Sequence, residues 1–121
     1  MSYKTKLKIG EFSNMMQLTV KTLRHYERKG LLIPYDVDEW TGYRYYTVDQ
    51  MQRLNNIRGL QRLGFSLDEI GMLYEEESHA PSISQLTSKI KETEERLRML
   101  LDRREKLLKW IRSLKEISKM G

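Results

Sequence analysis

The sequence predicts a mainly α protein, in which a winged helix-turn-helix domain precedes one long C-terminal helix. Three observations support this fold class. Two short amphipathic segments with helix-capping residues occupy residues 9–30, and a run of strand-favouring aromatic residues follows at 37–46. Residues 82–119 then contain no glycine or proline and repeat apolar side chains in heptads.

The first two helices are predicted from their apolar spacing. Each has its own apolar face, formed by Ile9, Phe12 and Met16 in the first and by Val20, Leu23 and Tyr26 in the second. Thr19 is a suitable N-cap for the second helix, and Gly30 is a suitable C-terminal stop. Two short helices joined by a tight turn at 17–18 predict a helix-turn-helix.

A two-stranded wing is predicted after these helices. Pro34 prevents helix continuation, and the strand-favouring residues Val37, Trp40, Tyr43 and Tyr45 surround a turn at 41–42. Trp40 is expected to be a packing anchor at the hairpin tip. Such a ribbon is marginal alone, so we expect it to pack against the helices.

Two further helices are predicted from capping boxes. Thr47 with Gln50 opens one helix, which Gly64 ends and which Gly59 could interrupt, and Ser66 opens the next with Glu69. These elements complete a predicted DNA-binding domain at residues 1–75. The acidic stretch at 76–81 ends in proline and is predicted to be a linker.

The last segment, residues 82–119, is predicted to be a dimerisation helix of roughly 55 Å. Eight of eleven heptad core positions are apolar, which favours a coiled coil, and a helix this long has no partner inside so small a chain. We therefore expect a homodimer. Thr93 and Arg104 interrupt the apolar stripe, whose predicted dimerisation residues are Ile83, Leu86, Ile90, Leu97, Leu100, Leu107, Ile111 and Leu114.

Composition narrows the functional classes. The net charge of +5 is compatible with a nucleic-acid partner, although residues 1–75 contribute only about +2 of it. The chain has no cysteine, which excludes disulfides and thiolate metal sites. We expect no cofactor, no metal and no membrane association, since no stretch approaches the roughly 20 apolar residues of a membrane span. A cytoplasmic location is the expectation.

The candidate DNA contacts fall in three groups. The second helix offers Thr19, Lys21, Thr22, Arg24 and His25; the wing offers Tyr43, Arg44 and Tyr45; the next helix offers Arg58 and Arg62. A helix start and basic side chains suit phosphates and base edges in a major groove. The alternatives are solvated charge for the basic residues and a tyrosine cluster that stiffens the wing. Strand alternation leaves open which tyrosine would face DNA.

The chain resembles the MerR family of bacterial transcription regulators, and its wing resembles the multidrug-sensing branch (the BmrR and Mta regulators). The matching motifs are Ile9-Gly-Glu-Phe12, Thr19-Val-Lys-Thr-Leu-Arg-His-Tyr-Glu27, Gly30-Leu-Leu32, Gly42-Tyr-Arg-Tyr-Tyr-Thr47 and Leu63-Gly-Phe-Ser-Leu-Asp-Glu-Ile70. The resemblance implies an antiparallel dimerisation coil, distortion of promoter DNA and action beside RNA polymerase. It also implies phosphate contacts by the wing arginine and a neighbouring tyrosine.

The sequence departs from that family in two respects. Metal- and redox-sensing members use cysteines near the coil, and this chain has none. Drug-sensing members carry a further C-terminal effector domain, so the chain is expected to be either a minimal regulator or part of a longer protein.

These observations predict a homodimeric regulator that binds an inverted-repeat operator in double-stranded DNA and distorts it. Activation and repression are both compatible with the sequence. The rival hypothesis is a coiled-coil module that binds an acidic protein. An enzyme is not expected, because the chain shows no nucleophile–histidine–acid pattern, phosphate-binding loop or metal-ligand spacing.

Overall fold

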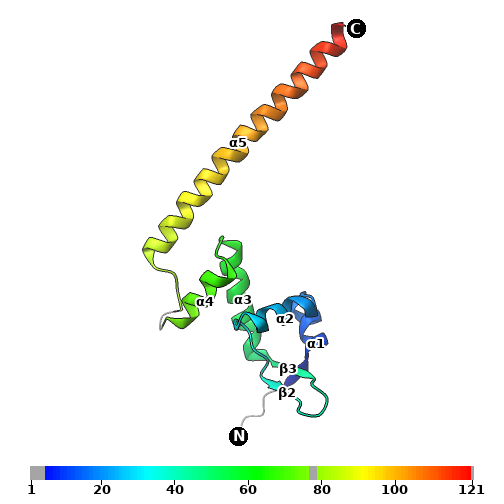
Figure 1. Cartoon of the computed structure of the whole chain (residues 1–121), viewed down its shortest axis with the longest axis vertical. Coiled ribbons are helices and arrows are strands. Elements are labelled where there is room, and N and C mark those ends of the chain that lie inside the picture. The colour runs from blue at the N-terminus through cyan, green and yellow to red at the C-terminus, as the bar shows by residue number, and fades with distance from the viewer. Residues whose placement is uncertain (1–4, 77–78, 121) are drawn as a thin grey trace. The chain divides into compact units, whose positions relative to one another are not determined.

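The computed structural model describes residues 5–76 and 79–120, and it divides the chain into two units, Met1–Ala80 and Pro81–Gly121. In Figure 1 the first unit contains β1 (Lys6–Lys8), α1 (Ile9–Met16), α2 (Val20–Arg28), β2 (Asp36–Val37), β3 (Arg44–Thr47), α3 (Val48–Arg62) and α4 (Leu67–Glu75). The second unit is α5 (Ile83–Met120). The division falls within the segment for which the sequence predicts a linker.

The helix-turn-helix is formed as predicted. α1 ends at Met16, and the left-handed backbone of the next residue, Gln17 (φ 56°), turns the chain toward α2. Thr19 caps α2, since its Oγ1 accepts a hydrogen bond of 3.1 Å from the Thr22 amide. Gly30 then leaves the helix with φ +72°, a conformation that residues with a Cβ rarely adopt.

The wing belongs to an antiparallel sheet with strand order β1-β3-β2 in the described part of the chain. The prediction of a two-stranded wing is therefore incomplete. β1 pairs with β3 through Lys6↔Thr47 and Lys8↔Tyr45. β1 has three residues, of which only Leu7 is apolar, and no hairpin turn connects it to β3. Its local sequence therefore gave little indication of a strand.

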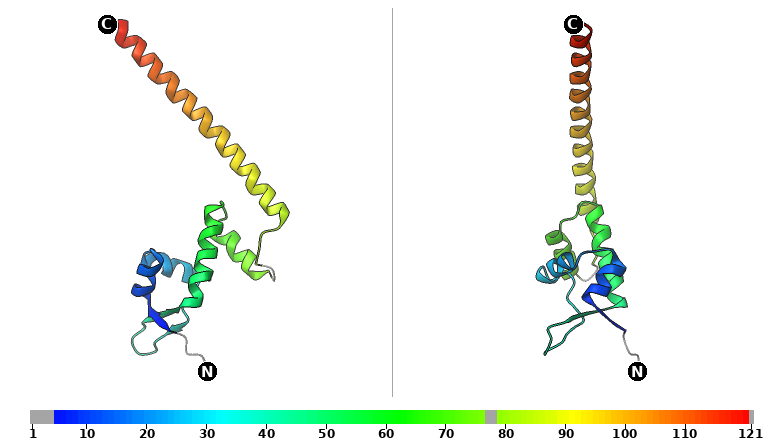
Figure 2. Two further views of the ribbon diagram at one scale, coloured as in Figure 1. Left: turned by 180° about the vertical axis from the view of Figure 1, so that it is seen from behind. Right: turned by 90° about the vertical axis from the view of Figure 1, so that its right-hand side faces the viewer.

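The capping boxes of α3 and α4 are present. The Thr47 amide donates to Gln50 Oε1 at 3.1 Å, and Ser66 and Glu69 exchange hydrogen bonds of 2.9 and 3.1 Å. α3 continues through Gly59 without interruption. In the left view of Figure 2, α3 is seen between the α1–α2 pair and α4.

The core of the first unit joins its four helices to β3. The Phe12 and Tyr46 rings stack with centroids 4.6 Å apart, and both side chains are fully buried. The same buried cluster contains leucine and isoleucine side chains from α2, α3 and α4, namely Leu23, Leu54, Ile57, Ile70 and Leu73. This packing attaches the helix-turn-helix to the wing through β3, and so fixes α2 relative to the strands.

α5 is a single helix of 38 residues, about 57 Å long at 1.5 Å per residue. It begins with a capping box, in which the Ser82 amide donates to Gln85 Oε1 at 2.7 Å and the Gln85 amide to Ser82 Oγ at 3.2 Å. Its eight apolar heptad residues are between 41% and 84% exposed. No helix among the described residues is long and apolar enough to cross a membrane.

Candidate nucleic-acid interface

The second helix of the helix-turn-helix separates a buried face from a basic one. Leu23 and Tyr26 are buried, whereas Lys21 and Arg24 are exposed on the opposite side of α2. The Thr19 and Thr22 hydroxyls are hydrogen-bonded to each other at 2.8 Å at the helix start. α2 therefore presents cations and hydroxyls along one outer edge, as a helix inserted in a major groove requires.

The sequence placed Tyr26 on the apolar face of the second helix, and the structure confirms that it is buried. Tyr26 is only 4% exposed, and its hydroxyl donates to Gln61 Oε1 at 2.9 Å. Burial raises the pKa of Tyr26 above its ordinary value, so the phenol remains neutral. His25 is half-buried on the neighbouring face.

Arg44 of the wing is held by Glu27 of α2. Its Nε donates to Glu27 Oε1 at 2.7 Å and its Nη2 to Oε2 at 3.3 Å, with both side chains under 30% exposed. The hydrogen bond and charge of Glu27 raise the pKa of the Arg44 guanidinium. Arg44 Nη1 makes no hydrogen bond within the described residues, so donors remain for a ligand.

The orientation of β3 shows which wing side chains are buried and which are exposed. Tyr46 points into the core and Arg44, on the same face, points toward α2. Tyr43 and Tyr45 lie on the other face, where Tyr43 is 55% exposed and Tyr45 is half-buried. Arg44 is therefore held against Glu27 of α2, while Tyr43 on the opposite face is exposed.

A groove lies between the first two helices and the wing. Three cations, Lys8, Arg24 and Arg44, line it with one carboxylate, Glu11, and its other lining residues are Ile9, Gly10, Asn14, Gly42 and Tyr43. The Lys8 ammonium lies over the Tyr43 ring, 5.3 Å from its centroid. This surplus of positive charge suits a phosphate chain. The sequence did not predict that Lys8 and Asn14 line this groove. The alternation of Lys6, Leu7 and Lys8 was only a weak signal of the strand that places Lys8 there.

The wing tip is a defined turn and not a packed anchor. Asp38 Oδ1 accepts hydrogen bonds from the amides of Trp40 and Thr41 at 2.8 and 2.9 Å, and these bonds lower the pKa of its carboxyl. Trp40 is nevertheless 93% exposed. The prediction that Trp40 packs at the hairpin tip is wrong, because the turn is held by hydrogen bonds to Asp38 instead.

The arginines of α3 differ in what they contact. Arg58 Nη1 donates to the Met16 carbonyl at 2.6 Å and so satisfies an end of α1. Arg53 Nε donates to the Leu31 carbonyl at 2.7 Å, and its guanidinium lies 4.2 Å from the Tyr74 ring centroid. Arg62 is exposed. Arg58 thus has an internal structural contact, and DNA contact by Arg58 and Arg62 stays a prediction.

The fold and the basic edge of α2 define a winged helix-turn-helix protein. The family model described as MerR HTH family regulatory protein matches residues 7–77, and the model described as MerR, DNA binding matches residues 51–119. Each covers more than half of the chain, and together they span residues 7–119. The chain belongs to the MerR family of helix-turn-helix regulatory proteins.

Two curated relatives illustrate the likeness. The mercuric resistance operon regulatory protein of Pseudomonas fluorescens is 38% identical over 94 residues, which span 75% of this chain and 65% of that protein. The multidrug-efflux transporter 1 regulator of Bacillus subtilis is 40% identical over 62 residues, which span 51% of this chain and 22% of that protein. Likeness to a multidrug regulator is confirmed, while the mercury regulator matches a longer stretch. The chain spans less than two thirds of either relative.

Among solved structures, the cryo-EM structure of an EcmrR–DNA complex superposes with a TM-score of 0.81 and 31% sequence identity. The alignment covers 91% of this chain and 40% of the EcmrR chain. The predicted fold class, a winged helix-turn-helix followed by a long helix, is confirmed by this likeness.

Proposed function

We propose that this chain is a homodimeric, sequence-specific DNA-binding transcription regulator of the MerR type that binds an inverted repeat. The observation that carries the proposal is the exposed basic edge of α2, with Lys21 and Arg24, beside a groove lined by further cations. In this proposal residues 1–75 bind DNA, 76–81 link the parts and 82–119 dimerise, and the protein acts in the cytoplasm.

Each group of candidate residues has a distinct task. Thr19, Lys21, Thr22, Arg24 and His25 approach bases and phosphates from α2 in the major groove. Tyr43, Arg44 and Tyr45 approach the flanking backbone from the wing, and Arg58 and Arg62 supply further positive charge. Rigid attachment of the wing to α2 through Glu27 and Arg44 supports a fixed spacing between these two contacts.

In a homodimer each subunit contributes one DNA-binding domain, and a two-fold axis relates the two. Such a dimer therefore matches the two halves of an inverted repeat. The named functions of the relatives, regulation of a mercuric resistance operon and of a multidrug-efflux transporter, fit a promoter as the target. Two DNA-binding domains held at a fixed separation can bend or untwist the DNA between them. The free energy of their contacts with the DNA offsets the cost of this deformation. Besides DNA and a second copy of the chain, the proposal includes RNA polymerase as a partner, acting at the distorted promoter.

The test is DNA binding by fluorescence anisotropy across a salt series, with a duplex selected from a random library and a shuffled duplex for comparison. We expect strong preference for the selected duplex and a steep loss of affinity with salt, because phosphate contacts release counterions. Arg24→Ala should weaken binding, whereas the matched control Lys109→Ala, on the outer face of α5, should not. Weak and equal binding to both duplexes would favour an acidic protein partner instead.

The dimer is tested separately by light scattering. Leu100→Asp places a charge in the apolar stripe of α5 and should give monomers that lose the operator, because an unpaired carboxylate in a helix interface is costly. Lys109→Asp introduces the same residue on the charged side of α5 and should remain dimeric. A dimeric Leu100→Asp protein would contradict the assigned stripe.

A further inference from the structure

The tip of the wing exposes a tryptophan that the core of the first unit does not use. Trp40 lies in the turn between β2 and β3, is 93% exposed, and is not part of the buried cluster of this unit. Tryptophan is highly buried on average in folded proteins, because its large apolar ring gains free energy on leaving water. The exposed indole of Trp40 is therefore available to a binding partner.

The turn holds Trp40 in a fixed position. Asp38 Oδ1 already accepts the amides of Trp40 and Thr41. In addition, the Gly42 amide donates to the Asp38 carbonyl at 2.9 Å, and the Asp38 amide donates to the Tyr43 carbonyl at 2.9 Å. A tip that is fixed before binding loses little conformational entropy when its side chain is bound. The wing thus presents the indole in a preformed position.

The position of the tip relative to the basic groove indicates what the indole meets. Gly42, Tyr43 and Arg44 line the groove, and Trp40 precedes them in the same hairpin. In both views of Figure 2 the loop between β2 and β3 extends away from the helices. A phosphate chain bound in the groove borders the major groove on one side and the minor groove on the other. Since α2 takes the major groove in the proposed function, the loop extends toward the minor groove.

We propose that Trp40 places its indole in the minor groove that borders each half-site, and that it makes the protein prefer A·T pairs there. The inference rests on the proposed DNA binding. It adds a contact outside the major groove, from a residue that is not among the DNA contacts predicted from the sequence, and a sequence preference outside the half-sites.

The chemistry of the minor groove gives the reason for the preference. The groove is about 6 Å wide, and in it A·T pairs present only the acceptors A N3 and T O2, whereas G·C pairs add the guanine N2 amino group. A flat apolar ring packs against the sugars and the floor of an A·T stretch, and the Nε1–H of Trp40 finds acceptors there. The guanine amino group would occupy the same space and would meet this donor with another donor.

Two carboxylates flank the indole, and they bear on affinity more than on base preference. Asp38 directs Oδ1 into the turn, whereas Glu39 is exposed and repels the phosphates on either side of the groove. Glu39→Gln should therefore strengthen binding to every duplex by a similar factor, about twofold at low salt, and should leave the A·T preference unchanged. Unchanged DNA affinity in Glu39→Gln would place the tip away from the phosphates and would overturn the proposal.

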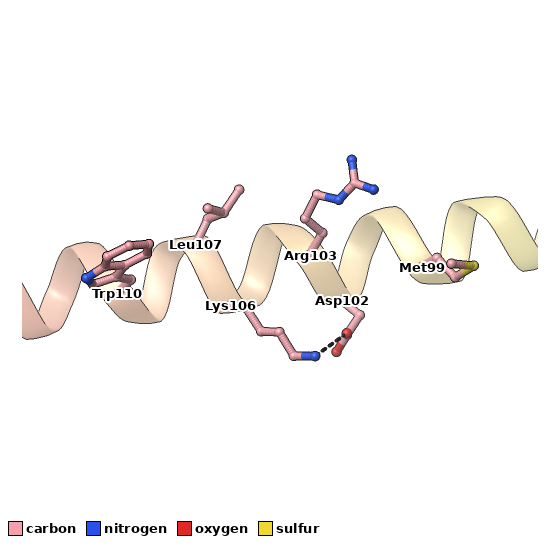
Figure 3. Close-up of a pocket in the computed structure, with 6 residues that line it drawn as sticks. All are labelled: Met99, Asp102, Arg103, Lys106, Leu107 and Trp110. Carbon is pink, nitrogen blue, oxygen red and sulfur yellow. Dashed lines mark ion pairs between the residues drawn. The ribbon is translucent and has the colours of Figure 1, made fainter.

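The fluorescence of Trp40 gives a direct test on the full chain. The sequence has two tryptophans, and Figure 3 shows the other, Trp110, on α5 one turn after Leu107. Trp110→Phe therefore leaves Trp40 as the only tryptophan. On saturation with the selected duplex, its emission should change and acrylamide should quench it less, because the ring leaves water. The control Trp40→Phe retains Trp110 alone and should show neither change. Unchanged emission and quenching of Trp40 at saturation would overturn the contact.

Three duplexes test the groove and the base pairs. All carry the selected half-sites, and the pairs that border them are A·T, G·C or inosine·C. Inosine lacks the N2 amino group of guanine but keeps its major-groove edge, so it separates the two grooves. The unsubstituted chain should bind the A·T and inosine·C duplexes about tenfold more tightly than the G·C duplex. Equal affinity for the inosine·C and G·C duplexes would overturn the minor-groove placement.

Trp40→Ala connects this preference to the residue. The side chain is exposed, so the variant should fold like the unsubstituted chain, which circular dichroism checks. It should bind the A·T duplex about tenfold more weakly and should bind the three duplexes with similar affinities. Val37→Ala, which removes another exposed apolar side chain of the same hairpin, is the matched control and should keep the preference. An A·T preference that persists in Trp40→Ala would overturn the role of Trp40.

The same measurements distinguish failure of this inference from failure of the proposed function. Weak and equal binding of the unsubstituted chain to the selected and shuffled duplexes would overturn both. Retention of both full affinity and the A·T preference in Trp40→Ala would overturn only the minor-groove contact. Loss of the A·T preference in Trp40→Ala, with continued discrimination between the selected and shuffled half-sites, supports both.

Discussion

Glu27 Oε1 of α2 accepts a hydrogen bond from Arg44 Nε of β3 at 2.7 Å, and this ion pair joins the helix that carries the basic edge to the wing. Both side chains are under 30% exposed, so solvent screens the pair only partly. The pair also places a carboxylate beside an arginine for which a phosphate contact is predicted. DNA and Glu27 must therefore share the donors of Arg44.

Removal of the Glu27 charge tests the structural part of this relationship. Glu27→Gln replaces a charge-assisted, two-point interaction by at most one neutral hydrogen bond, so we expect the free energy of unfolding to fall by about 1 kcal/mol. Urea denaturation followed by circular dichroism measures the change. Glu39→Gln, an exposed residue of the hairpin, is the control and should alter stability little. Equal stability of the two variants would show that the ion pair does not stabilise the wing.

Arg44→Ala tests the predicted phosphate contact. Phosphate contacts carry no sequence information, so affinity should fall by a similar factor for the selected and shuffled duplexes. The plot of log affinity against log salt concentration should become shallower by about one. Glu27→Gln serves as the comparison, because it perturbs the same ion pair while keeping the arginine. Unchanged affinity and salt dependence in Arg44→Ala would remove Arg44 from the interface.

The sequence predicted those features that depend on neighbours along the chain. Thr19, Gly30 and Ser66 signal helix ends through bonds that span a few residues, and each acts at its predicted position. The heptads of α5 are equally local. The pairing of Lys8 with Tyr45 and the bond between Glu27 and Arg44 join distant segments, and no local pattern announces such contacts. Trp40 was misjudged because an aromatic residue in a hairpin usually packs, whereas here hydrogen bonds hold the turn.

Most substitutions of core residues lower the free energy of unfolding. The buried hydroxyl of Tyr46 predicts the opposite for its removal. Tyr46 Oη has no hydrogen-bond partner in the described structure, so Tyr46→Phe removes an unsatisfied polar group and keeps the ring stacked on Phe12. We expect the free energy of unfolding to be unchanged or slightly higher. The matched control is Tyr26→Phe, which loses the bond to Gln61 and should cost about 1 kcal/mol. Loss of stability in Tyr46→Phe comparable to that in Tyr26→Phe would indicate a partner for its hydroxyl.

Alkaline pH should weaken the fold through the same tyrosine. Burial, with a smaller contribution from the nearby Glu27 charge, raises the pKa of Tyr46 to about 12 from an ordinary value of 10.0. The folded state therefore holds the phenolic proton more tightly than the unfolded chain does. The resulting stability is fully present below pH 10 and is lost as the pH rises through 12. Urea midpoints measured between neutral pH and pH 11 should fall more steeply for the unsubstituted chain than for Tyr46→Phe. Parallel declines would show that Tyr46 does not govern the alkaline limit, and would assign it to Tyr26 or Tyr74, whose pKa values burial also raises.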